Sequence, residues 1–156
     1  MTNYILGINL IGLANRFPEP EVWTRLVREE FDLDSVSFST DFVDPLWPKP
    51  IVEDYVDRTR ECLDQYKLSI DVLFFGIFTR RNLLMSPNPK IRKMWFEWYK
   101  GLIKLAVDLG AKGAGSPFGA MSVQDANDPQ RRQERIDEAI SMWQDLSFFA
   151  RDCGLE

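Results

Sequence analysis

The stretch Arg151–Glu156, RDCGLE, decides the fold that we predict for this chain of 156 residues. The residues before Gly154 are typical of the last turn of a helix, and Gly154 is typical of the left-handed residue that ends one. Leu155 then indicates the start of a new strand. The same order of helix end, glycine and apolar strand occurs in Asp108–Gly115, DLGAKGAG. We therefore expect the sequence to be part of a longer chain in which helices and strands alternate.

Strand-like and helix-like segments alternate along the whole chain. Four short, mostly apolar segments bounded by turn residues predict strands, at Tyr4–Ile11, Ser35–Thr40, Ser69–Phe75 and Ala111–Ser116. Apolar residues at spacings of three to five predict helices between and after them, at Glu19–Phe31, Ile51–Tyr66, Ile91–Leu109 and Gln130–Cys153. Asp128 and Pro129 suit the cap and first turn of the last helix. Strand starts recur about every 30–45 residues, which indicates a repeated βα unit.

This alternation predicts a parallel sheet with right-handed crossovers. Two α/β architectures remain open. A doubly wound open sheet binds its ligand where the strand order reverses, whereas the first four βα units of an eight-stranded TIM barrel carry the site on the loops after the strands. The strand that begins after Gly154 favours the barrel. We therefore predict a single incomplete domain, residues 1–156, that forms the N-terminal half of a (β/α)8 TIM barrel.

The composition makes some classes of binding partner improbable. The chain is 45% hydrophobic and carries a formal net charge of −5, which argues against sequence-independent binding of nucleic acid or anionic lipid. No apolar run approaches the ~18 residues of a membrane span, and the N-terminus does not resemble a signal peptide, so we expect a cytoplasmic location. Cys62 and Cys153 match no CxxC spacing, which predicts buried free thiols. The chain has no histidine, the commonest general base and transition-metal ligand.

In either architecture, functional side chains lie at strand ends and in the loops that follow them. Asn9 follows the first predicted strand. Asp41 is the one carboxylate directly at a predicted strand end, where it could act as a base or bind a sugar hydroxyl. Alternatively, it caps the turn before Pro45. Trp47, in a proline-rich loop on the same side, could stack on a substrate, whereas the other tryptophans lie on helix stripes and are predicted to be core.

A run of basic residues follows the third predicted strand. Arg80–Lys93, RRNLLMSPNPKIRK, contains no acidic residue. Arg80 and Arg81 could therefore meet a phosphate or another anionic group. The alternative is a solvated loop followed by the exposed start of a helix.

The glycines after the third helix do not form a dinucleotide-binding motif. The segment Gly110–Gly119, GAKGAGSPFG, lacks the third glycine of that fingerprint and opens a loop, not a helix N-terminus. We expect Gly115 and Gly119 instead to allow close approach of the backbone to a ligand or a neighbouring strand.

Four segments together resemble a known family: ILGINLIG at Ile5–Gly12, VSFSTDFVDPLWP at Val36–Pro48, the long stretch Asn82–Asp125 that begins NLLMSPNPKIRK, and ARDCGLE at Ala150–Glu156. They resemble the sugar-phosphate isomerases and epimerases with the xylose-isomerase-like TIM barrel. Within that family they look most like the tetrulose-phosphate (erythrulose phosphate) 3-epimerases. The similarity runs through nearly all of this chain but covers only about half of a family barrel.

The resemblance implies a divalent metal, Mg, Mn or Zn, held by Glu, Asp and His residues on strands five to eight, and two carboxylates that move the substrate proton through an enediolate. None of these positions lies before Glu156, so we assign no catalytic or metal-binding residue to this segment and expect it to be inactive alone. The substrate-facing residues that it implies here are Asn9, Asp41, Asn82, Gly115 and Ser116, with Arg80 or Arg81 at the phosphate.

The predicted function is therefore part of a sugar-phosphate isomerase or epimerase. Its ligand would be a small sugar phosphate. A half-barrel exposes two sheet edges, so we also expect a partner that completes the barrel, either a C-terminal half-barrel or a second copy of this chain. An alternative is a small α/β binding module that completes a barrel by self- or hetero-association, without catalysis. A nuclease of the same barrel superfamily is a third hypothesis, which the acidic charge and missing histidines disfavour.

Overall fold

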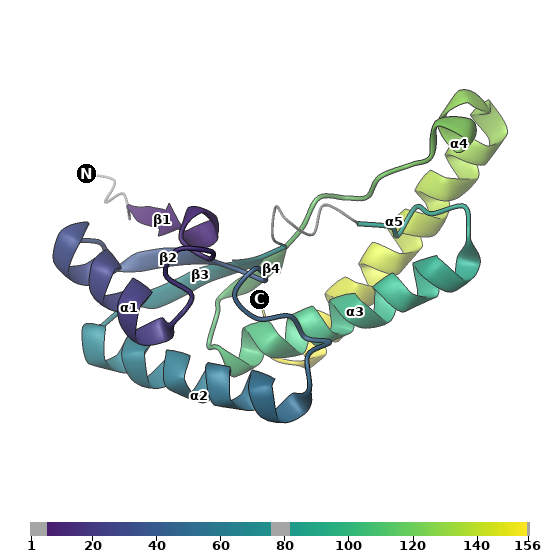
Figure 1. Ribbon diagram of the computed structural model, residues 1–156. Helices are drawn as coiled ribbons and strands as arrows, with labels where there is room; N and C mark the ends of the chain where they lie inside the picture. Colours follow the sequence, from purple (N-terminus) through teal and green to yellow (C-terminus); the bar gives the residue numbers. More distant parts are fainter. Residues whose placement is uncertain (1–5, 76–81, 156) are drawn as a thin grey trace, which may run out of the picture.

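Four parallel strands form one sheet in a computed structural model that describes residues 6–75 and 82–155 (Figure 1). The strands are β1 (Gly7–Asn9), β2 (Ser35–Ser39), β3 (Ser69–Phe74) and β4 (Gly113–Gly115). Each lies inside a predicted strand. The first ends early, because Leu10–Gly12 form a short 3₁₀ helix. The Asn9 side chain caps this helix by accepting a hydrogen bond from the Ile11 backbone N–H at 2.9 Å.

In the described residues, five α-helices accompany the strands: α1 (Pro20–Arg25), α2 (Lys49–Tyr66), α3 (Pro89–Asp108), α4 (Val123–Asn127) and α5 (Pro129–Asp152). A π-helical turn, Leu26–Glu30, extends α1. The four predicted helices are confirmed, and short α4 was not predicted. Gly110 and Gly154 adopt φ angles of 69° and 90°, as expected for left-handed helix ends. Asp128 caps α5 through the backbone N–H groups of Gln130 and Arg131.

The order of the strands distinguishes the two architectures. Consecutive strands are neighbours, in the order β1-β2-β3-β4, and helices α1, α2 and α3 lie on one side of the sheet (Figure 1). A doubly wound sheet would reverse its order and place helices on both faces. One-sided helices and sequential parallel strands are the arrangement of consecutive βα units of a barrel. The half-barrel prediction is therefore confirmed.

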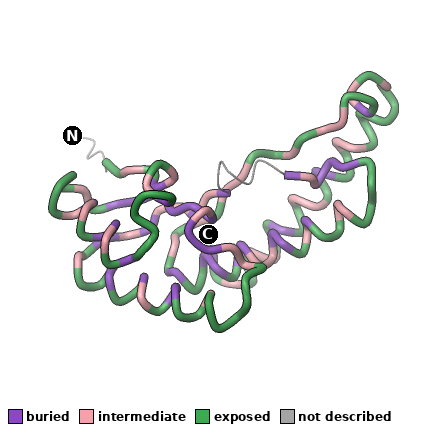
Figure 2. The backbone as a smooth tube through the Cα atoms, viewed as in Figure 1, coloured by how far each residue is buried: buried purple, intermediate pink, exposed green. Residues whose placement is uncertain are grey.

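The two faces of the sheet differ in chemistry. Apolar residues that point toward the helices are at most 1% exposed: Val36, Phe38, Ile70 and Leu73. Ser35, Ser37 and Ser39 alternate with them along β2 and point to the opposite face. Figure 2 shows the buried residues recurring along the strands and along the inner sides of α2 and α3. The hydrophobic core therefore lies between the sheet and the helices.

Aromatic side chains fill much of this core. Trp98 and Tyr99 of α3 lie with their ring centroids 5.2 Å apart, and both contact Phe75, which follows β3. Trp23, Trp95 and Trp98 are buried as predicted. Trp143 is only partly buried, but its ring packs 5.0 Å from Tyr99. Phe31 and Ile51, the end residues of two predicted helices, are 43% and 52% exposed.

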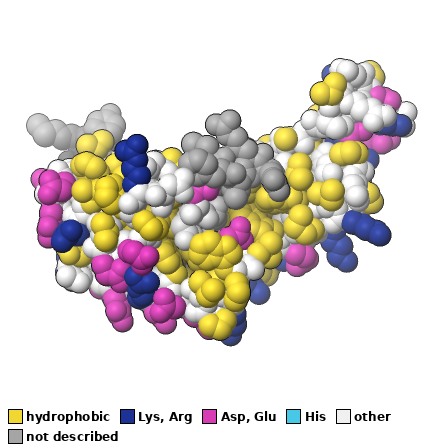
Figure 3. All heavy atoms as spheres, in the orientation of Figure 1, with side chains coloured by type: hydrophobic (Ala, Val, Ile, Leu, Met, Phe, Trp, Pro, Cys, Tyr) yellow, Lys and Arg dark blue, Asp and Glu magenta, His cyan; other side chains and the backbone are white. Residues whose placement is uncertain are grey.

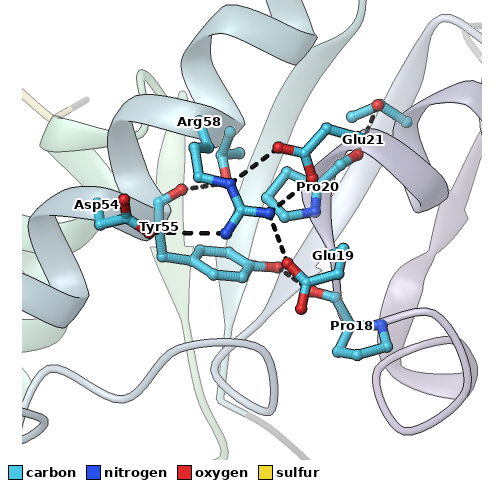
Figure 4. A network of polar contacts seen from close by, with 9 residues as sticks. Pro18, Glu19, Pro20, Glu21, Asp54, Tyr55 and Arg58 are labelled. Atoms are coloured by element: carbon cyan, nitrogen blue, oxygen red, sulfur yellow. Dashed lines mark hydrogen bonds and ion pairs between the residues drawn. The ribbon is translucent and has the colours of Figure 1, made fainter.

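A charged network joins α1 to α2 on the outside of the molecule (Figure 4). The Arg58 guanidinium donates hydrogen bonds to both carboxylate oxygens of Glu21, at 2.8 and 2.7 Å, and also pairs with Glu19. Nearby, the Tyr55 hydroxyl donates to the Pro18 carbonyl at 2.8 Å. The hydrogen bonds from Arg58 hold the pKa of Glu21 below its ordinary value of 4.5.

We expect this network to make the fold acid-sensitive. Folding favours the ionised form of Glu21, so its contribution is present above pH 4.5 and is lost as the pH falls through the lowered pKa. Arg58→Met should remove this part of the pH dependence of stability. It should lower the free energy of unfolding at neutral pH by at most about 1 kcal/mol, since the Arg58–Glu21 ion pair is partly exposed and screened by solvent. Urea unfolding measured as a function of pH tests this.

The matched control is Arg60→Met. Arg60 is exposed on the same helix and makes no ion pair among the described residues. This variant should keep the acid dependence of the wild type. An Arg58→Met protein with the same acid profile as the wild type would contradict the assignment.

Candidate functional site

The candidate site lies at the carboxyl edge of the sheet, where Asn9 ends β1, Asp41 follows β2 and Ser116 follows β4. Because the strands are parallel and in sequential order, these ends meet along one edge. The edge is continuous: the Thr40 N–H donates to the Phe74 carbonyl, and the Phe75 N–H donates to the Gly115 carbonyl, both at 3.1 Å. The backbone therefore fixes the spacing of the loops that carry the candidate residues.

Asp41 is held in place by the last residue of β2. The Ser39 hydroxyl donates to Asp41 Oδ2 at 2.9 Å, and the Asp41 backbone N–H donates back to Ser39 Oγ at 3.1 Å. Its other carboxylate oxygen has no hydrogen-bond partner among the described residues. The cap of the turn at Pro45 is Asp44, whose Oδ1 accepts from the Leu46 N–H at 2.8 Å. Ser39 therefore orients the Asp41 side chain at the end of β2, and Asp41 does not cap the turn at Pro45.

Asn82 joins the loop after β3 to the loop after β4. It is only 4% exposed. Its Nδ2 donates to Ser116 Oγ at 3.4 Å and to the Pro117 carbonyl, and its Oδ1 accepts from the Leu84 N–H at 3.3 Å. Its own carbonyl accepts from the Ala120 N–H at 3.1 Å. Both ends of the amide thus bind the chain, so Asn82 positions these two loops.

Tyr99 is a site residue that sequence reasoning missed. This α3 side chain is 1% exposed, and its hydroxyl lies 2.5 Å from Ser116 Oγ. Burial raises the pKa of Tyr99 to about 12. The one signal in the sequence is a hydroxyl-bearing aromatic residue beside the apolar stripe of α3. Tyr99 therefore fixes the position of the Ser116 side chain through a contact from the hydrophobic core.

Gly119 lies close to a side chain of the loop after β3, not to a neighbouring strand. Its φ angle is 151°, and a Cβ placed there would lie 2.9 Å from Met85 Cγ. The neighbour is the loop after β3. At Gly115 a Cβ would meet Val72 Cγ2 at an ordinary 3.5 Å, so space alone does not require a glycine there.

Trp47 lies exposed in the loop before α2. Together with Leu46 and Ile51 it makes an exposed apolar patch, with exposed fractions of 45%, 68% and 52%. Figure 3 shows hydrophobic side chains gathered over the start of α2. Among the described residues, no hydrogen bond or ring contact joins Trp47 to Asp41 or Ser116. Stacking of Trp47 on a substrate stays a prediction.

The basic run is described only in part. Arg80 and Arg81 lie outside the described residues, so their contact with a phosphate stays a prediction. Farther along, Arg92 donates to the Ser86 carbonyl at 2.7 Å and pairs with Glu138 of α5 at 3.2 Å. That arginine therefore links α3 to α5.

The described residues do not fit a divalent metal centre. Within residues 6–75 and 82–155, no three His, Cys, Asp or Glu side chains come together in a group that could hold a metal ion. Cys62 and Cys153 are both free, as predicted, but only Cys62 is buried, because Cys153 lies at the end of α5 and is partly exposed. None of the helices in the described part of the chain is long and apolar enough to span a membrane.

Comparison with known proteins identifies the architecture. No family model matches the sequence. The chain is 26% identical over 151 residues to D-erythrulose 1-phosphate 3-epimerase from Brucella abortus (strain 2308), an alignment that covers 97% of this chain and 49% of that protein. A crystal structure named as a candidate xylose isomerase from Rhodospirillum rubrum superposes with a TM-score of 0.92 and 28% identity, over 99% of this chain and 52% of that one. The chain has the fold of half a xylose-isomerase-like TIM barrel.

This half-barrel spans about half the length of the relatives it matches. The resemblance to the tetrulose-phosphate 3-epimerases is confirmed by the Brucella match. A more distant likeness is to a xylose isomerase-like TIM barrel protein from Mycobacterium smegmatis in complex with magnesium, with a TM-score of 0.63 and 19% identity over 99% of this chain and 54% of that one. The relatives of the half-barrel thus include sugar isomerases and epimerases.

Proposed function

We propose that the half-barrel is the substrate-facing N-terminal part of a sugar-phosphate isomerase or epimerase that acts on a ketose phosphate. The reaction would remove a proton from the carbon next to the carbonyl and return it through an enediolate. The observation that carries this proposal is the alignment with the D-erythrulose 1-phosphate 3-epimerase over 97% of the chain. The same observation favours an epimerase over a binding module without catalysis, and over a nuclease.

The roles proposed for this chain are binding and orientation of the sugar. Asp41 has one carboxylate oxygen fixed by Ser39, which leaves the other to accept a hydrogen bond from a substrate hydroxyl. Asn9 uses its Oδ1 on the Ile11 N–H, so its amide nitrogen remains to donate to a sugar oxygen. Ser116 and Gly115 would present the backbone at the end of β4, and Arg80 or Arg81 would bind the phosphate.

The catalytic groups are proposed to come from a C-terminal half-barrel, with residues 1–156 as a single incomplete domain. The described residues offer no metal centre, whereas a protein with the same fold was solved with magnesium. That other half would then hold the divalent metal and the proton-transferring carboxylates, as the family resemblance implies. This chain alone would then bind sugar phosphate weakly and not turn it over.

A fused barrel tests the proposal. The half-barrel is joined to the C-terminal half of the Brucella epimerase, and NMR follows epimerisation and deuterium uptake at carbon 3 of erythrulose 1-phosphate. We expect turnover, and Asp41→Asn should lower kcat/KM by about 10- to 100-fold, because a charged hydrogen bond to substrate is lost. The control Asp57→Asn, on the exposed side of α2, should be neutral. A folded fusion that neither epimerises nor exchanges would contradict the proposal.

A further inference from the structure

The loop after β4, residues 116–122, leads from the sheet to α4 without helix or strand (Figure 1). Pro117, Phe118 and Ala120 of this loop are exposed, as in most loops that run over the surface of a protein. Such loops are usually the mobile parts of a fold. The first half of this loop, however, is hydrogen-bonded to α3, to α5 and to the loop after β3. Its conformation is therefore held from several sides.

The start of the loop is held by α3 and by the loop after β3. The Tyr99 hydroxyl lies 2.5 Å from Ser116 Oγ. The Asn82 amide donates to the Pro117 carbonyl, and the Asn82 carbonyl accepts from the Ala120 N–H at 3.1 Å. These contacts join segments that are far apart in the sequence, so the loop takes its shape from the tertiary structure.

Trp143 of α5 supplies a contact between the two residues that Asn82 binds. Its indole Nε1 donates to the Phe118 carbonyl at 2.8 Å. The Trp143 ring packs against the Tyr99 ring, with centroids 5.0 Å apart and an angle of 59° between the planes. Because Tyr99 is 1% exposed, this packing anchors the indole to the core. The core thus sets the position of a donor that holds an exposed loop.

We propose that Trp143 is a positioning residue for the sugar phosphate, and that its indole N–H holds the loop after β4 in the conformation that receives the ligand. It acts through the loop and not by touching the reacting atoms. The loop begins at Ser116, at the carboxyl edge of the sheet, and the inference rests on the proposed function in placing the sugar there. A loop that is ordered before binding loses less conformational entropy when the ligand arrives. Release of the loop should therefore weaken binding more than it slows the chemical step.

Trp95 of α3 offers a matched control in the same aromatic cluster. It is 8% exposed, and its ring centroid lies 6.3 Å from that of Tyr99. Within the described part of the chain, the Trp95 Nε1 has no hydrogen-bond partner. Trp95→Phe therefore makes the same chemical change as Trp143→Phe without removing a hydrogen bond. A difference between the two variants reports the indole N–H of Trp143 and not the loss of ring volume.

Amide hydrogen exchange on the chain of 156 residues gives the first test. Trp143→Phe should speed exchange at the Ala120 N–H by about 3- to 10-fold, because the loop loses one of the hydrogen bonds that keep it closed. Trp95→Phe should leave exchange at Ala120 unchanged. Wild-type exchange at Ala120 in Trp143→Phe overturns the proposal, whatever the fused barrel does.

The kinetics of the fused barrel give the second test. Trp143→Phe should raise KM for erythrulose 1-phosphate by about 3- to 10-fold and change kcat by less than about twofold. Trp95→Phe should leave both constants unchanged. Equal losses in the two variants, or a loss confined to kcat, overturn the positioning role. A fused wild type without turnover contradicts the proposed function instead, and exchange at Ala120 still decides whether Trp143 holds the loop.

Discussion

Replacing Trp98 by alanine should lower the free energy of unfolding by about 3–5 kcal/mol. The side chain is 4% exposed, and its ring centroid lies 5.2 Å from those of Phe75, Trp95 and Tyr99. Its Nε1 also donates to Asp44 Oδ1 at 3.0 Å. The substitution therefore opens a large cavity and frees the loop after β2. A loss of this size is a large fraction of the ~5–15 kcal/mol that stabilises a typical domain.

Urea unfolding at a fixed chain concentration measures this loss, because association would otherwise change the apparent stability. The matched control, Trp98→Phe, keeps an aromatic ring but removes the donor to Asp44. This variant should lower the free energy of unfolding by less than the alanine variant does, and about 1 kcal/mol of that loss should come from the missing hydrogen bond. An alanine variant that loses less than the phenylalanine variant would show that the aromatic cluster is not the centre of the core.

The Asn82→Ala substitution should lower the free energy of unfolding by about 2–3 kcal/mol, because it removes a buried amide that is hydrogen-bonded to both loops. The Ser116 hydroxyl, the Pro117 carbonyl and the Leu84 N–H each lose a partner. The loops after β3 and β4 should then separate more often. We expect faster amide hydrogen exchange at Leu84 and at Ala120, whose N–H donates to the Asn82 carbonyl.

Ser86→Ala is the control for this effect. Ser86 is buried in the same loop, but within the described part of the chain its hydroxyl accepts only from the nearby Asn88 N–H, at 3.2 Å. This variant should leave exchange at Ala120 unchanged. In the fused barrel, Asn82→Ala should raise KM more than it lowers kcat, as expected of a residue that positions binding loops. Unaltered exchange at both Leu84 and Ala120 would contradict the role given to Asn82.

The candidate site was predictable in its positions but not in its contacts. Asp41 was recognisable because a carboxylate directly follows a strand. The Ser39 hydroxyl that orients it is a neighbour in sequence, yet serine at a strand end has no distinctive pattern. Asn82 and Ser116 are 34 residues apart, and Tyr99 reaches Ser116 from a helix. Nothing local in the sequence predicts such pairs, because they form only when the sheet brings two loops together.

Local chemistry determined the elements of this chain. Apolar spacing set the four main helices and the strands, while Gly110, Gly154 and Asp128 ended or began helices through their own backbone and side-chain preferences, which need no distant partner. The strand that begins after Gly154 already favoured sequential parallel strands with the helices on one side. Tertiary structure alone decided the linkage of the loops by Asn82 and the contact of Tyr99 with Ser116. These features depend on which segments pack together across long separations in the chain, and that choice is set by burial of the shared apolar core between sheet and helices.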